Sequence, residues 1–151
     1  TRLSAQSSHA KRYVGGTAQN LWKFPAGATE ATPLTGDYRG TSKSPMWWQG
    51  RLYFSSDRDG TMNLWSMKPD GTDLKQLTRH ADFGVRFPAL QGGRIVYQNG
   101  ADLWLLDIAT NQSAIVPITL VRQHASISDS CPAAAAKRPR AAASNADRVS
   151  S

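Results

Sequence analysis

The sequence is poor in the residues that mark membrane, secreted and cysteine-rich metal proteins. Cys131 is the only cysteine, which excludes an internal disulfide and a cluster of cysteine metal ligands. No apolar run approaches the roughly 20 residues that a membrane-spanning helix requires. Residues 1–8 lack the apolar stretch of a secretory signal. We therefore expect a cytoplasmic protein with no membrane partner, or a periplasmic one if the natural N-terminus carries an export signal.

Net charge is also low where the aromatic residues lie. The 151 residues include 18 Lys and Arg against 11 Asp and Glu, and a net charge of +7 by itself suggests an anionic partner such as nucleic acid. However, residues 1–12 carry +3, residues 122–151 carry +3, and residues 13–121 carry only +1 with every Trp, Tyr and Phe. We therefore expect a nearly neutral folded body between two basic ends, and no nucleic-acid partner.

The two ends differ from the body in composition as well as in charge. Residues 1–12 form an atypical segment, and residues 122–151 form a low-complexity tail rich in Ala, Ser and Arg, both expected to be disordered. The basic run Lys137–Arg140 has no neighbouring aromatic residue, so we interpret it as part of a solvated tail. Our hypothesis for the tail is an out-of-frame or truncated-gene terminus, which other reading frames of the DNA beyond codon 121 would test.

The body contains an internal repeat. Its clearest marker is a tripeptide ending in Trp22, Trp65 and Trp104, which lie 43 and 39 residues apart. Further positions keep the interval of 43, namely Leu34-Thr35 with Leu77-Thr78, Pro45 with Pro88, Arg51 with Arg94, and Leu52-Tyr53-Phe54 with Ile95-Val96-Tyr97. So many matches in one register indicate a structural unit that recurs along the chain.

One period of this repeat predicts four short strands and no helix. Proline and glycine occur too often for useful helices, and Asp-Gly pairs mark tight turns. The expected strands are Pro45–Trp48, Arg51–Ser55, Met62–Met67 and Leu74–Thr78. Four strands in 40 to 45 residues are typical of a β-propeller blade, whereas a β-sandwich would not explain the period.

The fold class is therefore all-β, with about two and a half blades of four antiparallel strands. One blade, Pro45–Thr78, is expected to be complete, and its neighbours at 13–37 and 88–117 to be partial. Trp65 and its equivalents are expected to fill the space between sheets. Unpaired blade edges would favour self-association.

The motifs of this repeat resemble a known family. Ser44-Pro45, Gly50–Gly60, Asn63-Leu64-Trp65 and Asp70–Thr78 together look like a blade of TolB and tricorn-type propellers. Two further stretches, Gly15–Pro25 and Arg94–Trp104, are similar to the N-terminal propeller of bacterial tricorn protease homologues. The resemblance covers about residues 13–121.

The resemblance implies a function. Tricorn-type enzymes are large cytoplasmic serine peptidases that cut oligopeptides, and their catalytic residues lie in a downstream region. This chain would then be a fragment of the N-terminal propeller, a substrate-gating scaffold without catalytic residues, which meets peptide substrates through the full-length parent. The alternative is a TolB-like module that binds protein partners.

Few residues are candidates for catalysis or for metal binding. Asp57, Asp59 and Gly60 superficially suggest a calcium loop, but the EF-hand pattern is missing and a turn capped by Asp side chains is favoured. No Gly-x-Ser-x-Gly elbow supports a catalytic triad. We therefore expect no catalytic, metal or cofactor site.

One segment remains as a candidate site. Arg79, Asp82 and Arg86 are predicted to line the mouth of the propeller channel and to contact a peptide terminus. Within this segment the ring of His80 is expected to hold the loop through a hydrogen bond to Asp82.

Overall fold

The computed structural model describes residues 14–15 and 18–119, and its regular structure is entirely β. In this part of the chain there is no helix that is long and apolar enough to cross a membrane. The predictions for residues 1–12 and 122–151, including Cys131 and Lys137–Arg140, lie outside the described residues.

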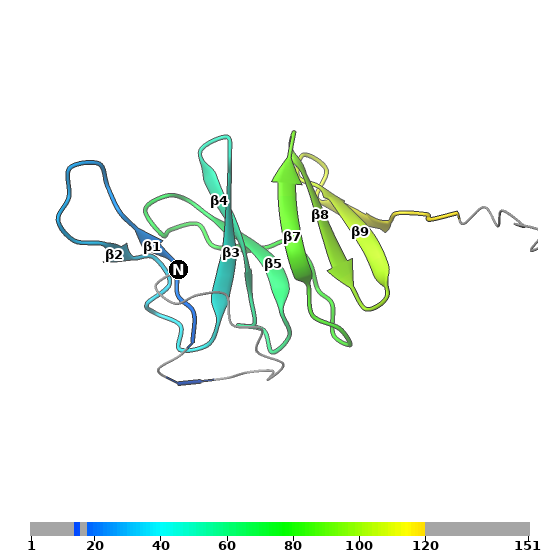
Figure 1. Cartoon of the computed structure of the whole chain (residues 1–151), viewed down its shortest axis with the longest axis horizontal. Helices are drawn as coiled ribbons and strands as arrows, with labels where there is room; N and C mark the ends of the chain where they lie inside the picture. The colour runs from blue at the N-terminus through cyan, green and yellow to red at the C-terminus, as the bar shows by residue number, and fades with distance from the viewer. Residues whose placement is uncertain (1–13, 16–17, 120–151) are drawn as a thin grey trace, which may run out of the picture. The chain divides into compact units, whose positions relative to one another are not determined.

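In the described part of the chain, ten strands form three antiparallel sheets that follow one another along the sequence (Figure 1). A two-stranded sheet, the first hairpin, comprises β1 (Trp22–Lys23) and β2 (Thr32–Pro33). Blade 1 comprises β3 (Ser42–Trp48), β4 (Arg51–Ser56), β5 (Asn63–Met67) and β6 (Lys75–Gln76). Blade 2 comprises β7 (Arg86–Gln91), β8 (Arg94–Asn99), β9 (Asp102–Asp107) and β10 (Gln112–Ile115). The all-β class and the count of about two and a half blades are confirmed.

Blade 2 is complete, so the prediction of a partial blade at 88–117 was wrong. Its sheet has the order β10-β9-β8-β7, the counterpart of β3-β4-β5-β6 in blade 1. The hairpin between β9 and β10 was not predicted because its turn contains no glycine. Instead the Asp107 carboxylate accepts the backbone N–H groups of Ala109 and Thr110, and Asn111 takes the left-handed conformation at a φ of 54°.

Among the described residues, two hydrophobic clusters lie between the three sheets, one in each interface. The first hairpin and blade 1 share a cluster of Leu21, Leu52, Phe54 and Met67, with Leu34 and Trp65 packed against it. The two blades share a larger cluster of Tyr53, Leu64, Val85, Ile95, Tyr97 and Leu106, with Trp104 packed against it. Because side chains alternate across a strand, blade 1 supplies β4 and β5 side chains to both clusters. The intersheet role predicted for the tryptophans is confirmed for Trp65 and Trp104, whereas Trp22 is exposed.

The Asn-Leu-Trp repeat has a hydrogen-bonding reason. In blade 1 the buried Thr78 hydroxyl donates to Asn63 Oδ1 at 2.9 Å and accepts the N–H of Leu64 at 2.9 Å. In the first hairpin the Thr35 hydroxyl pairs in the same way with Asn20 and the N–H of Leu21. We call this arrangement the Asn–Thr clasp, and it joins the third and fourth strands of a blade at their ends.

Candidate functional site

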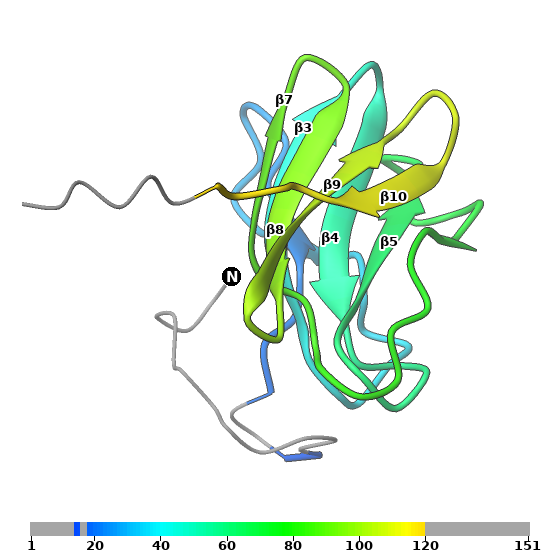
Figure 2. The ribbon, with the colours of Figure 1, turned by 90° about the vertical axis from the view of Figure 1, so that its right-hand side faces the viewer.

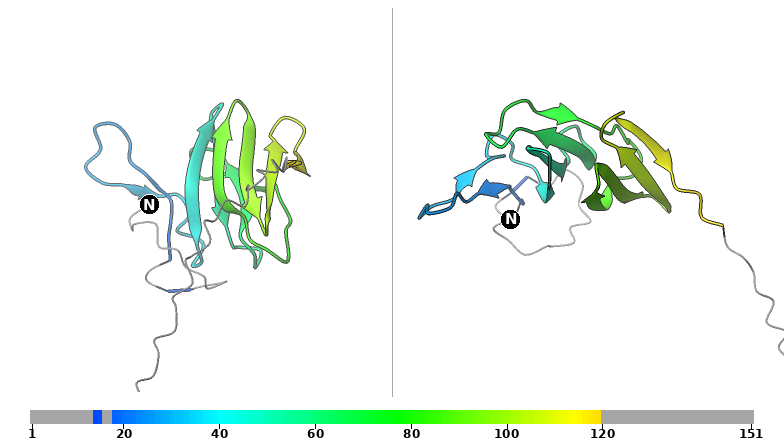
Figure 3. Two further views of the ribbon diagram at one scale, coloured as in Figure 1. Left: turned by 45° about the vertical axis from the view of Figure 1, so that its right-hand side comes forward. Right: turned by 90° about the horizontal axis from the view of Figure 1, so that it is seen from above.

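The strands β3 and β7 are the innermost strands of their blades. Each is the first strand of its sheet, and β3 and β7 contact each other across the gap between the two sheets, which Figures 1 and 2 show side by side. From this contact each sheet continues through its second strand, β4 in blade 1 and β8 in blade 2. Figure 3 shows the sheets following one another from the blue to the yellow part of the chain. In a propeller the blades surround a central channel. Residues exposed on β3 and β7 are therefore the candidates for a channel lining.

Both innermost strands carry a β-bulge at the same position of the repeat. The register of β3 against β4 shifts between Lys43 and Met46, and that of β7 against β8 shifts between Arg86 and Ala89. The cause is in the sequence, because Pro45 and Pro88 have no N–H to donate to the ladder. A bulge re-aims the side chains next to it.

The residues before each proline are conformationally unusual. Ser44 and Phe87 occupy equivalent positions and have positive φ angles of 55° and 49°. For an aromatic residue such as Phe87 this conformation is costly, and strain of this kind clusters at functional sites. Phe87 is also 82% exposed, the most exposed large hydrophobic residue of the described part.

A cation precedes each of these strained residues. Lys43 in β3 and Arg86 in β7 are separated by 43 residues, the interval of the repeat, so the two innermost strands present a positive charge at the same level. The structure thus adds Lys43 to the predicted Arg86. Sequence reasoning could have found Lys43, because Pro45 and Pro88 had already been matched.

The other predicted site residues lie just outside β7. Arg79 and Asp82 are exposed in the connection between β6 and β7, and Arg86 is exposed at the first position of β7. Arg86 therefore lies on the first strand of blade 2, and Arg79 and Asp82 lie in the connection that leads to it. Their contact with a peptide stays a prediction.

His80, within this connection, is held by both blades. Its backbone N–H donates to Asn63 Oδ1 at 2.8 Å, and its Nε2 is 3.0 Å from the Tyr97 hydroxyl. The ring also lies edge-on to Trp104, with centroids 5.0 Å apart. Burial lowers the pKa of His80, which favours the neutral ring. The predicted hydrogen bond to Asp82 stays a prediction, and the observed ring contacts fix the connection that carries Arg79 and Asp82.

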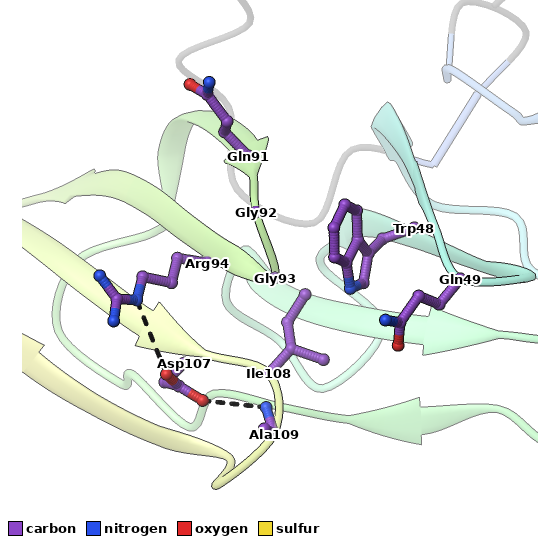
Figure 4. A pocket seen from close by; sticks show the side chains of 9 residues that line it. All are labelled: Trp48, Gln49, Gln91, Gly92, Gly93, Arg94, Asp107, Ile108 and Ala109. Atoms are coloured by element: carbon purple, nitrogen blue, oxygen red, sulfur yellow. Dashed lines mark hydrogen bonds and ion pairs between the residues drawn. The ribbon is translucent and has the colours of Figure 1, made fainter.

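A cavity of about 440 Å³ lies between the blades at the tight turns (Figure 4). Its lining comes from the turn at Trp48 and Gln49, the turn at Gln91–Arg94, and Asp107–Ala109. Arg94 Nε is 3.8 Å from Asp107 Oδ2, and hydrogen bonds from Ala109 and Thr110 lower the pKa of that carboxyl. The charges in this cavity are thus already paired within the protein.

Arg58 is the centre of a network that sequence reasoning missed. Its guanidinium carbon lies 5.0 to 5.8 Å from the ring centroids of Tyr38, Phe54 and Trp65, and burial lowers its pKa. Next to it the buried Asp57 carboxylate accepts the Tyr38 hydroxyl at 3.0 Å. Burial, together with this carboxylate, raises the pKa of Tyr38 to about 12. The network ties the chain before β3 to the turn after β4.

The turn predicted at Asp57–Gly60 is confirmed, and its two aspartates form different hydrogen bonds. The Gly60 N–H donates to the Asp57 carbonyl, and Asp59 accepts the N–H of Thr61 and the side-chain amide of Asn63. The Asp57 carboxylate binds the Tyr38 hydroxyl instead, so the two carboxylates bind different parts of the protein. Among the described residues no group of three His, Cys, Asp or Glu side chains could hold a metal ion.

Repeated four-stranded antiparallel sheets, packed face to face with their first strands innermost, define a segment of a β-propeller. The family model of the tricorn protease N-terminal beta propeller domain matches residues 1–112. The chain belongs to that family.

Individual relatives agree with this assignment. Tricorn protease homolog 1 of Streptomyces coelicolor is 39% identical over 105 residues, which are 70% of this chain and 10% of the relative. The tricorn protease homolog of Saccharolobus solfataricus is 38% identical over 97 residues, which are 64% of this chain and 9% of the relative. This chain thus spans about a tenth of the length of these relatives.

Solved structures show the same fold. The crystal structure of the tricorn protease matches with a TM-score of 0.68 and 28% identity, over 76% of this chain and 11% of that chain. A TolB-type protein from Agrobacterium tumefaciens matches with a TM-score of 0.55 and 21% identity, over 64% of this chain and 40% of that one. The second likeness shows the fold alone.

Proposed function

We propose that this chain is part of the substrate-gating and scaffold propeller of a tricorn-like serine peptidase, and that it carries no catalytic residues of its own. The family assignment supports the proposal, since the matched relatives are named as tricorn proteases. The parent enzyme is proposed to act on peptides in the cytoplasm.

The observation that carries the gating role is the matched pair of cations on the innermost strands. Lys43 and Arg86 recur at one level of the repeat, each beside a bulge and a residue with positive φ. A charge repeated on the inner strand of successive blades gives the channel one sign of potential, which steers ligands of the opposite sign. Arg79 and Asp82 belong to the same proposed mouth of the channel, and the exposed Phe87 supplies apolar contact area for a peptide.

Binding of labelled peptides to the 151-residue chain tests the gating role. We expect fluorescent hexapeptides with acidic side chains to bind more tightly than their amide counterparts, and the double variant Lys43→Ser/Arg86→Ser to lose this preference. Lys68→Ser is the control, because Lys68 is an exposed cation that directly follows β5 and lies on neither β3 nor β7. Equal binding of acidic and neutral peptides, or an equal loss in the control, would overturn the role.

A separate assay tests the absence of chemistry. The purified chain should leave a peptide panel intact, and cleavage that a serine-directed inhibitor abolishes would refute this part of the proposal. A TolB-like protein-binding module remains the alternative function. If the chain binds none of the peptides but binds a folded protein through Lys43 and Arg86, that alternative is favoured.

A further inference from the structure

The innermost strands β3 and β7 each have one edge without a neighbouring strand. Both lie at the end of their sheets, in the orders β3-β4-β5-β6 and β10-β9-β8-β7, and neither pairs with a strand on its second side in the described part of the chain. Each strand has its full sheet beside it, so this is the inner edge of a complete blade, the side next to the channel of a propeller. An unpaired edge offers N–H and C=O groups to an extended chain.

The hairpin turns determine which backbone groups point to this edge. In the turn Gln49-Gly50 both residues have positive φ, which is typical of a two-residue type I′ hairpin. The residue that closes such a turn, Trp48, exchanges hydrogen bonds with its partner on β4. Because bonded and non-bonded pairs alternate along an antiparallel ladder, the N–H and C=O groups of Trp47 point away from the sheet. The same kind of turn at Gly92-Gly93 gives Leu90 this orientation in β7.

Observed hydrogen bonds confirm the alternation at the other end of both strands. Ser42 at the start of β3 donates its N–H to the Gln19 carbonyl at 2.7 Å instead of to β4. Val85, which directly precedes β7, donates its N–H to the Met62 carbonyl at 2.7 Å. At this end the inner edge therefore already pairs with a backbone segment outside its own sheet.

The backbone groups of Trp47 and Leu90 have no such partner among the described residues. Two residues before each of them lies a proline, Pro45 or Pro88, which has no N–H to offer. A proline on an edge strand prevents a long strand from pairing along the whole edge. The available edge is therefore short, which suits the reversible binding of a peptide.

We propose that the innermost strands bind an extended peptide by strand addition, with the N–H and C=O groups of Trp47 and Leu90 paired to the peptide backbone. This proposal rests on the channel role given above and specifies how the channel recognises a peptide. Pairing through the main chain does not depend on the side chains of the peptide, so one site accepts many sequences. Both blades offer this pair of groups at the same level, because Trp47 and Leu90 are equivalent positions of the repeat.

The cations set the direction of the peptide. Lys43 and Arg86 lie near the start of β3 and β7, four residues before Trp47 and Leu90. A peptide that runs antiparallel to these strands has its carboxyl end there, beside positive charge, whereas a parallel peptide would bring its ammonium group. We therefore expect antiparallel pairing.

N-methylated peptides test the pairing on the unchanged 151-residue chain, with binding followed by fluorescence anisotropy. The probe is a labelled, uncharged hexapeptide rich in Thr and Val. Successive residues of a strand direct their N–H groups to opposite edges, so methylating the second and fourth residues blocks one edge, whereas methylating the third and fourth blocks both. We expect the first peptide to bind like the unmethylated one and the second to bind about tenfold more weakly.

Two double variants test the protein side of the pairing. Trp47→Pro/Leu90→Pro removes both outward N–H groups, and Trp47→Ala/Leu90→Ala removes the same side chains but keeps these groups. Proline is tolerated where the N–H of an edge strand faces outward, so both variants should keep a native circular dichroism spectrum. We expect the proline variant to bind the unmethylated peptide about fivefold more weakly than the alanine variant. If the proline variant does not fold, the peptide comparison decides.

A third comparison tests the direction. One peptide carries its single negative charge as a C-terminal carboxylate, and the other carries it as an N-terminal succinyl group. We expect the carboxylate peptide to bind more tightly, and the opposite order would overturn the antiparallel direction.

The outcomes separate strand pairing from the channel role. Equal binding of the two methylated peptides would overturn the pairing, and so would equal binding by the folded proline and alanine variants. If the preference for acidic peptides persists while methylation has no effect, the cations act as proposed and the pairing is wrong. If methylation weakens binding but acidic and neutral peptides bind equally, the pairing is supported and the charge-based gating is wrong.

Discussion

Replacing Thr78 by Val tests whether the Asn–Thr clasp stabilises a blade. The two side chains have nearly the same shape, so the substitution opens no cavity and removes only the hydroxyl. Its loss leaves the N–H of Leu64 and one lone pair of Asn63 Oδ1 without a partner in a fully buried environment. An unsatisfied buried donor costs about 1–3 kcal/mol. For a domain of this size that loss lowers Tm by roughly 4–8 °C per kcal/mol.

Urea unfolding followed by tryptophan fluorescence measures this loss. Thr72→Val is the matched control, because the Thr72 hydroxyl also donates to a side chain, Asp70 at 2.7 Å, but does so at the exposed turn after β5. A surface substitution of this kind changes the free energy of unfolding by about 0.5 kcal/mol or less. If Thr78→Val is no more destabilising than Thr72→Val, the clasp is not a source of stability and our explanation of the repeat fails.

Three further predictions concern other parts of the fold. Burial lowers the pKa of His80, so the unfolded chain takes up a proton at this residue before the folded chain does as the pH falls below about 6.5. The free energy of unfolding should therefore decrease in this pH range. His80→Gln should weaken that pH dependence in urea titrations at pH 5.5 and 7.5. Gly100→Ala should raise the unfolding rate more than Gly92→Ala in stopped-flow measurements, since both glycines have positive φ but only at Gly100 would the added Cβ lie 3.2 Å from a ring atom of Phe83. Arg58→Ala should cost about 2 kcal/mol in thermal unfolding, because the side chain lies between three aromatic rings; an unchanged Tm would show that these ring contacts do not stabilise the fold.

Much of the fold could be predicted because residues that recur at the repeat interval occupy equivalent packed positions in each sheet. The matches of Trp65 with Trp104 and of Leu77-Thr78 with Leu34-Thr35 mark positions that meet the same neighbours in each sheet. The turn at Asp70-Gly71 was predictable for a local reason, since the Asp70 carboxylate caps the N–H of Thr72. Local signals of this kind need no knowledge of distant residues.

The remainder depends on contacts between distant residues or on turns without a signature residue. The Tyr38 hydroxyl meets Asp57 across 19 residues, and Nε2 of His80 meets Tyr97 on the next blade. Neither pairing leaves a pattern in the sequence. The last hairpin of blade 2 was missed because Asn111 replaces the glycine expected at a left-handed position.

The candidate site was predicted in part. Arg86 was identified from its place between blades, and the interval of 43 residues would have added Lys43. The positive φ of the exposed Phe87 could not be foreseen, because a residue before proline normally adopts an extended conformation with negative φ.

The face-to-face packing of blade 1 on blade 2 is the central claim, and methyl NOE spectroscopy tests it most directly. In a sample labelled at Ile, Leu and Val methyl groups, Leu64 of β5 should show cross-peaks to Ile95 of β8 and Leu106 of β9, which share its cluster. Cross-peaks confined to each sheet, with none between Leu64 and the residues of blade 2, would contradict the stacked blades.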